Sequence, residues 1–501
     1  MAKYVMANRR SGKFHESEKR ASRASLDTSF HTLLAANVHL IGDTNPSDDQ
    51  KRRVMIFEAE PVEIKAKKAS LPPDVMIEPE ILHYTDVSRR FYSAFSPFAA
   101  IAEALPVAAG ATLTVTVVGG GNPLAGAEVI LFLRGSGGLA RRLTALTSSL
   151  GQAIFNFSPI WTPTALVAVP AGGFWSVVIR GPEDGMTVTV PPLPQDGPLS
   201  WWHRALGISN SDPTRGSGIK VGVIDTGAGP HGFLSHVTSV GSFIDGAFDP
   251  GGGADSDSHG SHVCGTVGAR PSTNSDYLGI TPGVDLFCAR VFPPGQGANQ
   301  GDIADAIDSL SKDHQVDLIN LSLGAPSPSE IERDAIRDAL ERGTLCVCAA
   351  ANSAGPVEFP AAFPESVAVS ALGLEGWGPD GTLAATRQPS EKEKFGSARM
   401  FLANFSCFGP EIDCCAPGVG IISTVPERNG LMTPYGSMDG TSMASPVACG
   451  ALAAILSATP DYQNLPRDVS RAERARALLK ANCQDVGMEA GFQGRGIPRV
   501  I

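Results

Sequence analysis

The second half of the chain alternates apolar runs with amphipathic stretches. Five runs are dominated by apolar residues: KVGVIDTG, VDLFCARVF, VDLINLSLG, TLCVCAAA and SVAVSAL. Stretches between them, such as GDIADAIDSLSKD and PSEIERDAIRDALERG, repeat their apolar residues at helical spacing. Strands that are buried on both faces give such continuous apolar runs, and helices between them cover a parallel sheet. Residues 199–501 are therefore predicted to form an α/β domain with a mainly parallel sheet.

A different pattern occupies residues 107–195. Short runs rich in β-branched and aromatic residues, among them TLTVTVVG, AEVILFLRG, GQAIFNF and MTVTVPP, are separated by Gly, Pro and Asn. Their spacing of roughly ten residues is typical of small all-β sandwiches. We predict a sandwich of an immunoglobulin-like or carboxypeptidase-regulatory-like kind, with a small barrel as the alternative.

The first 85 residues mix charged positions with short apolar runs. RRVMIFEAEPVEI is typical of a strand, and LPPDVMIEPEILHY of an extended segment limited by proline. We predict a small α+β domain over residues 1–85 and a linker over residues 86–106. The chain of 501 residues is thus predicted to be multidomain.

Composition narrows the classes of function. Apolar residues make up 43% of the chain, which is enough for sizeable cores, and the formal net charge of -11 with no dense basic patch argues against nucleic acid as a partner. No apolar run reaches the ~18 residues of a membrane span. The N-terminus lacks the apolar core of a signal peptide. We expect a cytoplasmic protein whose nine cysteines, all after residue 260, are mostly buried thiols.

Two candidates for acid–base chemistry follow from local sequence. Asp225 comes directly after the apolar residues 221–224, at the carboxyl end of a predicted strand, where α/β sheets form their sites. Its alternative role is to cap a turn. His259 begins a predicted helix that Asp257 or Ser258 can cap, and imidazole titrates near neutral pH. His259 is therefore a candidate general base, and Asp225 a candidate to orient it.

Two neighbours of His259 have simpler roles. His262, one helical turn on, is predicted to be a hydrogen-bonded structural histidine. HxxH lacks the spacing and the glutamate of helical zinc sites, so a metal role is the weaker alternative. Gly260 is predicted to let another backbone or a substrate approach closely.

A hydroxyl and an amide complete the candidate site. Ser442 lies where a Gly-containing loop enters the apolar helix TSMASPVACGALAAILS, and a helix N-terminus suits an alkoxide or oxyanion. Ser445 is the competing hydroxyl, predicted to bond along the helix, and Pro446 is predicted to lie in the first turns. Asn352 ends the TLCVCAAA strand, where its amide can donate to an oxyanion or form a turn.

The separate blocks together resemble one family. IDTG, HGSHVCGTV, LSLG, AAAN, FPAAFPESVAVSA, APG and GTSMASP are similar to the blocks of subtilisin-like serine proteases, over about residues 199–501. The resemblance implies a triad in which Ser442 attacks a peptide carbonyl, His259 takes its proton and Asp225 holds the imidazole. It also implies that Asn352 and the Ser442 N–H stabilise the oxyanion.

The same resemblance implies where polypeptide substrate binds. Residues 322–324 are similar to the edge segment that pairs with an extended substrate. Glu358 is similar in position to the floor of the S1 pocket, where a carboxylate would favour Lys or Arg at P1; its alternative is an exposed loop glutamate. The implied substrate-binding residues are Ser322, Leu323, Gly324, Ala350, Ala351 and Glu358.

Residues 1–85 resemble a propeptide of this family. The resemblance implies that the chain's own N-terminal domain is an intramolecular inhibitor. A cut after Tyr84 would place tyrosine at P1, whereas a cut after Arg90 would agree with Glu358, and both remain open. No cofactor is expected to be required. Calcium is in doubt because the loop TGAGPHGF after Asp225 lacks an obvious acidic ligand, and no metal ligands are assigned.

Other classes of function compete with the enzyme. One is a catalytically silent scaffold or binding protein on a protease fold, and another is an adhesion or targeting protein led by the sandwich. An esterase is disfavoured because GTSMASP is not the GxSxG elbow. The leading expectation is a serine endopeptidase that acts on extended polypeptide.

Overall fold

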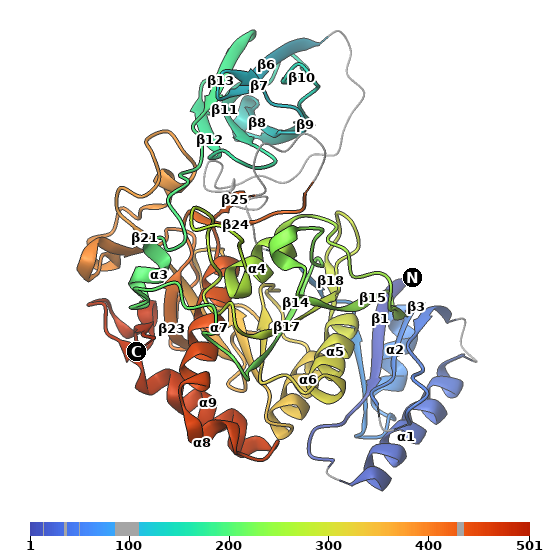
Figure 1. Ribbon diagram of the computed structural model, residues 1–501. Coiled ribbons are helices and arrows are strands. Elements are labelled where there is room, and N and C mark those ends of the chain that lie inside the picture. Colours follow the sequence, from blue (N-terminus) through green and yellow to red (C-terminus); the bar gives the residue numbers. More distant parts are fainter. Residues whose placement is uncertain (14, 35–37, 50, 86–109, 428–434, 501) are drawn as a thin grey trace.

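The computed structural model of the protein describes residues 1–13, 15–34, 38–49, 51–85, 110–427 and 435–500. Figure 1 shows three parts: a large central domain, a small N-terminal domain (blue) beside it, and a β-rich domain (teal to green) at one end. The predicted linker, residues 86–106, lies outside the described residues.

The N-terminal domain is a four-stranded antiparallel sheet with two helices. The sheet order is β2-β3-β1-β4. Alternate residues of a strand face opposite sides, and both sides are buried here. Tyr4 and Met6 pack towards α1, whereas Val5 and Ala7 share a core with the central domain. Its elements are β1 (Ala2–Asn8), α1 (Glu16–Leu34), β2 (His39–Asp43), β3 (Val54–Ala59), α2 (Pro61–Lys68) and β4 (Val75–Pro79).

Residues 111–190 form two sheets that share one core. One sheet has the order β10-β6-β13 with β7 beside β6, and the other β12-β11-β8-β9. Val115 of the first sheet and Leu131 of the second belong to the same buried cluster. The strands are β6 (Ala111–Gly119), β7 (Asn122–Pro123), β8 (Glu128–Arg134), β9 (Ala140–Leu146), β10 (Gln152–Phe157), β11 (Thr162–Val169), β12 (Val177–Arg180) and β13 (Met186–Val190).

The central domain is built on a mixed, mainly parallel sheet, so the predicted α/β class is confirmed. The order is β16-β15-β17-β14-β19-β20-β21-β22, with β23 also paired to β21, and only β16 and β22 run antiparallel to their neighbours. Its strands are β14 (Lys220–Asp225), β15 (Thr238–Ile244), β16 (Ala247–Asp249), β17 (Asp285–Arg290), β19 (Leu318–Leu321), β20 (Leu345–Ala349), β21 (Val367–Leu374), β22 (Met400–Leu402) and β23 (Ile412–Pro417).

Helices cover both faces of this sheet. Val221 and Val223 of β14 pack in the cluster that contains α4 and α7, whereas Ile224 packs with α5 and α6. The helices are α3 (Trp201–Ala205), α4 (His259–Gly268), α5 (Gln300–Asp308), α6 (Glu330–Glu341), α7 (Thr441–Ser457), α8 (Pro460–Gln463), α9 (Val469–Ala481) and α10 (Ala490–Gln493). Short strands outside the sheet are β5 (Leu82–His83), β18 (Ala298–Asn299), β24 (Ile421–Thr424), β25 (Tyr435–Met438), β26 (Cys483–Gln484) and β27 (Ile497–Pro498).

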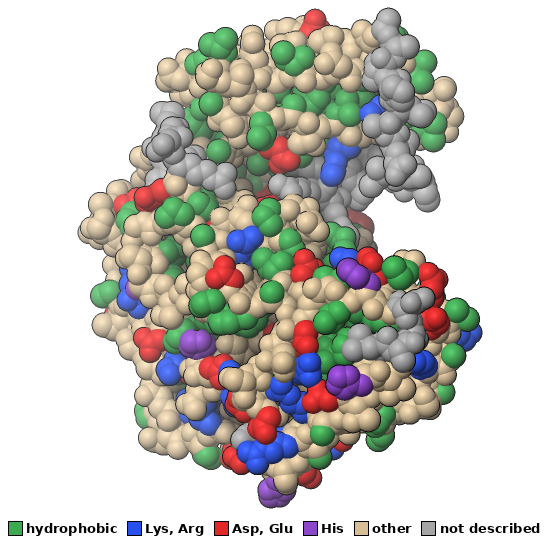
Figure 2. Space-filling model, turned by 90° about the vertical axis from the view of Figure 1, so that its right-hand side faces the viewer, with side chains coloured by type: hydrophobic (Ala, Val, Ile, Leu, Met, Phe, Trp, Pro, Cys, Tyr) green, Lys and Arg blue, Asp and Glu red, His purple; other side chains and the backbone are tan. Residues whose placement is uncertain are grey.

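The two smaller parts are both docked on the central domain. Two arginines of the N-terminal domain, Arg10 and Arg52, are fully buried against carboxylates of α5 and α6. The β-rich domain is held by backbone bonds, including Leu383 N to Ser176 O at 2.8 Å, and Leu383 also packs into a small apolar cluster of the β-rich domain. Charged side chains of both signs gather over the lower part of the molecule in Figure 2, whereas the face of the β-rich domain carries few.

Two expectations from composition can be compared with the structure. No helix among the described residues is long and apolar enough to cross a membrane. All nine cysteines are free thiols; eight are buried and Cys483 is partly exposed. The expectation of mostly buried thiols is therefore confirmed.

Candidate active site

The site begins where β14 ends and α4 begins. Asp225 is the last residue of β14 and His259 the first of α4, and both are buried. His259 Nδ1 donates to Asp225 Oδ1 at 2.6 Å, and the Thr226 N–H donates to the same oxygen at 2.7 Å. Burial lowers the pKa of His259, but the charge and hydrogen bond of Asp225 outweigh it, and the net shift raises the pKa above 6.5. The carboxylate therefore orients the imidazole and favours its charged form.

The start of α4 is capped by Asp255, a residue that sequence reasoning missed. Ser258 has a left-handed φ of 96° and makes no side-chain cap bond, so the expected cap by Ser258 is wrong, whereas Asp257 stays a prediction. Asp255 Oδ2 accepts from Ser261 N in the first turn of the helix at 2.8 Å. Asp255 Oδ1 accepts from Ser258 N at 3.0 Å and from Thr226 Oγ1 at 2.8 Å. One carboxylate thus ties the loop after Asp225 to the helix that carries His259.

Gly260 has the close approach that the sequence predicted. A Cβ built on Gly260 would lie 2.0 Å from the carbonyl oxygen of Gly227, a backbone atom with little freedom to move. The loop after Asp225 therefore packs directly on the first turn of α4.

Ser442 is clamped to Ser322 at the start of α7. Ser442 Oγ donates to the Ser322 carbonyl at 3.1 Å, and Ser322 Oγ donates to the Ser442 carbonyl at 2.8 Å. Pro446 lies within the first turns of the helix, as expected, and has no N–H for the Ser442 carbonyl four residues earlier. The Ser322 hydroxyl replaces that missing helical bond, which fixes the serine at a buried helix N-terminus.

The second imidazole nitrogen of His259, Nε2, differs from Nδ1 in its hydrogen bonding. Within the described residues, His259 Nε2 is buried and has no hydrogen-bond partner. Helices α4 and α7 pack against each other, with Val263 and Met443 in one core. The Ser442 hydroxyl has one proton, which it donates to the Ser322 carbonyl, so a bond to the imidazole would require that bond to break; catalytic hydrogen bonds are often unformed before substrate binds.

Asn352 lies next to the candidate nucleophile. Asn352 Oδ1 accepts from Thr441 N at 2.9 Å and from Thr441 Oγ1 at 3.0 Å. These bonds hold the amide beside the residue that precedes Ser442, and they set its orientation because the oxygen end is engaged by Thr441. The NH₂ end is then the end of the amide that could donate to an oxyanion.

An extended segment of the N-terminal domain occupies the candidate substrate edge. Tyr84 N donates to Gly324 O at 3.1 Å and Gly324 N donates to Tyr84 O at 3.2 Å. On its other side the segment pairs through β5 with β18, with His83 opposite Ala298. The carbonyl of Tyr84 is therefore engaged by Gly324, two residues from the buried Ser322, and is not presented to Ser442.

Glu358 lies against the segment that the resemblance assigned to substrate binding. Glu358 N donates to Ala350 O at 3.2 Å, and Glu358 Oε1 accepts from Ser353 Oγ at 2.7 Å. Glu358 Oε2 is buried and lacks a hydrogen-bond partner among the described residues. Ala350, Ala351 and Leu323 are buried beside one another in the same apolar cluster. Glu358 as a whole is half-buried, so it differs from the exposed loop glutamate that was the alternative.

His262 has the structural role that the sequence predicted. Its Nε2 donates to the Ile421 carbonyl at 2.9 Å, and burial lowers its pKa to about 3, so it is neutral. Over the described ranges, no three His, Cys, Asp or Glu side chains converge as a metal site.

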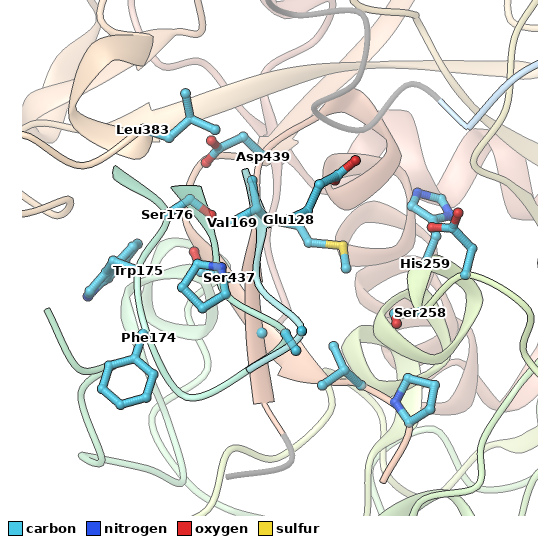
Figure 3. Close-up of a pocket in the computed structure, with 18 of the residues that line it drawn as sticks. Glu128, Val169, Phe174, Trp175, Ser176, Ser258, His259, Leu383, Ser437 and Asp439 are labelled. Carbon is cyan, nitrogen blue, oxygen red and sulfur yellow. The ribbon is translucent and has the colours of Figure 1, made fainter. Parts of the chain in front are cut away.

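A cavity of about 270 Å³ lies next to His259, between the central and β-rich domains. Figure 3 shows Glu128, Val169 and Phe174 on its β-rich side, and Ser258 and His259 on the other. Sequence reasoning did not predict this cavity, because it gave no position for the β-rich domain.

Comparisons with known proteins agree with this geometry. Residues 216–496 match the model of the Subtilase family. The chain belongs to the subtilase family. It is 33% identical over 274 residues to Subtilisin Savinase of Lederbergia lenta, covering 54% of this chain and 89% of that protein.

Two further relatives match the same part of this subtilase. It is 33% identical over 274 residues to the Alkaline protease of Alkalihalobacillus alcalophilus, covering 54% of this chain and 63% of that protein. It is 33% identical over 280 residues to the Major intracellular serine protease of Bacillus subtilis (strain 168), covering 53% of this chain and 76% of that protein. The subtilase is accordingly a serine endopeptidase, a hydrolase that acts on polypeptide.

Proposed function

We propose that this subtilase hydrolyses extended polypeptide with Asp225, His259 and Ser442 as its triad. The observation that carries the proposal is the 2.6 Å bond from His259 Nδ1 to Asp225 Oδ1, which leaves the buried Nε2 as the basic nitrogen. Ser442 Oγ would turn from the Ser322 carbonyl, lose its proton to His259 Nε2 and attack the scissile carbonyl. His259 would then return the proton to the leaving amine, and water would hydrolyse the acyl-enzyme by the reverse sequence of proton transfers.

Two donors would stabilise the tetrahedral intermediate. One is the Asn352 amide, whose oxygen is held by Thr441, and the other is the Ser442 N–H at the start of α7. Both are fixed before the reaction, so no reorganisation is needed when charge develops on the oxygen.

Replacement of the nucleophile tests the triad. Ser442→Ala should abolish both labelling by a fluorophosphonate probe and hydrolysis of peptides. Ser445→Ala is the matched control, because Ser445 Oγ bonds within the core to Asn320 and Val347. Equal labelling of the parent and Ser442→Ala would refute the assignment.

We also propose that the protease is made as a self-inhibited precursor. Supporting this, residues 82–84 are bonded as an extended strand between β18 and Gly324, where substrate backbone would bind. The cleaved peptide bond would lie further along the chain than the bond between Tyr84 and Thr85, because the Tyr84 carbonyl is bonded to Gly324. N-terminal sequencing of the purified parent and of Ser442→Ala tests this: a new N-terminus only in the parent supports self-cleavage, and an uncut active parent contradicts it. Arg90, the other proposed P1 residue, lies outside the described residues.

A preference for Lys or Arg at P1 is the third part of the proposal. Its support is the buried Glu358 Oε2, an acceptor with no partner among the described residues, against Ala350. An incoming ammonium or guanidinium would satisfy that oxygen. The test is a peptide set varied at P1: the parent should favour Lys and Arg over Leu and Phe, and Glu358→Gln should remove that preference. An unchanged profile would contradict it.

The cytoplasmic location remains part of the proposal. One relative is named an intracellular protease, which supports it. Fractionation of cells that express the full chain tests it, and recovery of the protein only outside the cells would refute it.

A further inference from the structure

The direction of the bound segment shows where the scissile bond of a substrate would lie. Tyr84 pairs antiparallel with Gly324, so an extended chain in that register passes Leu323 and then Ser322 as it continues. Ser322 is bonded to Ser442 through both its hydroxyl and its carbonyl. A substrate in this register therefore has its scissile bond near Ser442, and the residues after that bond lie beyond it.

The cavity between the two domains begins at this point. Thr85, the next residue after the paired Tyr84, lines it together with His259. Met438 and Asp439, which precede the helix of Ser442, line it as well. The cavity thus adjoins the position of the scissile bond, next to His259 and to the residues that precede Ser442.

The β-rich domain forms the opposite wall of this cavity. Glu128 and Leu146 are cross-strand partners on β8 and β9, and both line it. Figure 3 shows Glu128 between the β-rich domain and His259, beside the wall formed by Ser437 and Asp439. The wall is held in place because Gly173 N donates to Tyr435 O at 2.7 Å and Val177 bridges Thr382.

The charges that face the cavity are acidic. Three carboxylates line it, from Glu128, Asp257 and Asp439, and no Lys or Arg is among its described lining residues. Asp439 is already neutralised by Arg387, whose Nε donates to Asp439 Oδ2 at 3.0 Å. Glu128 is the carboxylate that the β-rich domain itself supplies.

We propose that this cavity is a subsite beside the scissile bond that takes a Lys or Arg side chain, with Glu128 as its specificity-determining residue. The inference rests on the proposed endopeptidase function and deepens it. A cation entering the cavity meets a carboxylate in a partly enclosed space, where a charge-assisted hydrogen bond is strong. The β-rich domain thereby takes part in substrate selection.

The test uses internally quenched peptides with one fixed residue at P1 and Lys, Arg, Gln, Leu or Glu at each of the two positions before P1 and the three positions after the scissile bond. The full chain, after whatever self-cleavage it performs, is compared with Glu128→Gln. We expect the parent to show about a tenfold higher kcat/KM for Lys or Arg than for Gln at one of these positions. Glu128→Gln should lower that preference to under threefold and leave the Gln peptides unaffected.

Two further variants separate the local charge from other effects. Glu183→Gln removes an exposed carboxylate of the same domain outside the cavity lining, and should keep the preference. Leu146→Lys places a cation beside Glu128 at a side chain that is 68% exposed, so folding should tolerate it, and it should abolish the preference without change at Glu128.

The outcomes are distinguishable from failure of the endopeptidase proposal. If the parent cleaves peptides with no preference for a basic residue at any of these positions, or if Glu128→Gln and Leu146→Lys retain the preference, only the subsite is refuted. If the parent cleaves no peptide and matches Ser442→Ala, the endopeptidase proposal fails and the subsite fails with it.

Discussion

Replacement of Arg52 by Met should release the N-terminal domain from the protease. Arg52 is fully buried; its Nε donates to Asp308 Oδ2 at 3.0 Å and its Nη1 to Asp334 Oδ2 at 2.6 Å. Its charge, together with that of Arg10, lowers the pKa of Asp308 to about 2 against the opposing effect of burial. Methionine keeps an apolar side chain of similar length but removes every one of these bonds.

The expected loss of docking free energy depends on the bonds that Asp308 and Asp334 keep after Arg52 is replaced. Removal of one partner from a buried ion pair costs about 3–5 kcal/mol. Arg10 still donates to Asp308 through Nη1 at 3.0 Å and to Asp334 through its backbone N–H at 2.8 Å. The carboxylates are thus partly satisfied, and we expect the lower end, about 3 kcal/mol, which corresponds to roughly a hundredfold change in the docking equilibrium.

Hydrogen exchange of a full-length chain that cannot cut itself measures this equilibrium. In the Ser442→Ala background, the amides of Tyr84 and Gly324 donate to each other's carbonyls only while the domain is docked. Their exchange should accelerate about a hundredfold in Arg52→Met, as long as docking opens locally. The amides of β1 and β3 should stay protected, which separates undocking from unfolding of the domain.

The adjacent arginine is the control. Arg53 bonds Asp43 and Asp27 within the N-terminal domain, so Arg53→Met should change exchange at Tyr84 and Gly324 by less than threefold. Protection at Tyr84 that is equal in Arg52→Met and Arg53→Met would refute the reasoning, because the buried ion pairs would then not hold the domain in place.

Three other predictions concern the catalytic domain. Asp225→Asn should lower kcat about 10⁴-fold. It should also move the acid limb of kcat/KM from above pH 6.5 to below it. The reason is that His259 must be neutral to accept a proton, and without Asp225 the burial of His259 lowers its pKa. An unmoved limb in a pH–rate profile would contradict this. Asn352→Ala should lower kcat about 10²- to 10³-fold with little effect on KM in steady-state kinetics, and a loss under fivefold would exclude it as an oxyanion donor. Gly260→Ala should destabilise the fold by about 1–3 kcal/mol in urea unfolding, since its Cβ would lie 2.0 Å from Gly227 O, whereas Gly355→Ala, with its nearest contact at 3.8 Å, should be neutral; equal midpoints would contradict the close packing.

The elements that carry the site could be predicted because their signals are local. The apolar run before Asp225 marks a strand buried on both faces, and Asp225 is indeed the last residue of β14. Small residues and a glycine around His259 and Ser442 mark two tightly packed helices, which begin at His259 and Thr441. In these segments the neighbouring residues alone indicate which positions are buried and where the backbone must pack closely. The strand and the two helices can therefore be recognised without knowledge of distant contacts.

Weaker local signals failed. Helix α1 was not located from sequence, because only Leu26, Phe30 and Leu33 supply its apolar stripe among charged and small residues. The local sequence favours a cap of α4 by Asp257 or Ser258, yet Ser258 makes no side-chain cap bond and Asp255 accepts from Ser261 N in the first turn. A cap depends on backbone angles, such as the left-handed φ of Ser258, which the residue types alone do not specify.

The sequence by itself determined the α/β class of the central domain and the residue types available for chemistry, since both follow from hydrophobic periodicity and short motifs. Only the tertiary structure decided that Ser322 replaces the helical bond lost at Pro446, that residues 82–84 lie on the Gly324 edge, and that Glu128 faces His259 across a cavity. Each of these joins segments more than a hundred positions apart, and contacts over such separations arise from how whole domains pack. Periodicity within one segment carries no information about the partner on which its surface will dock.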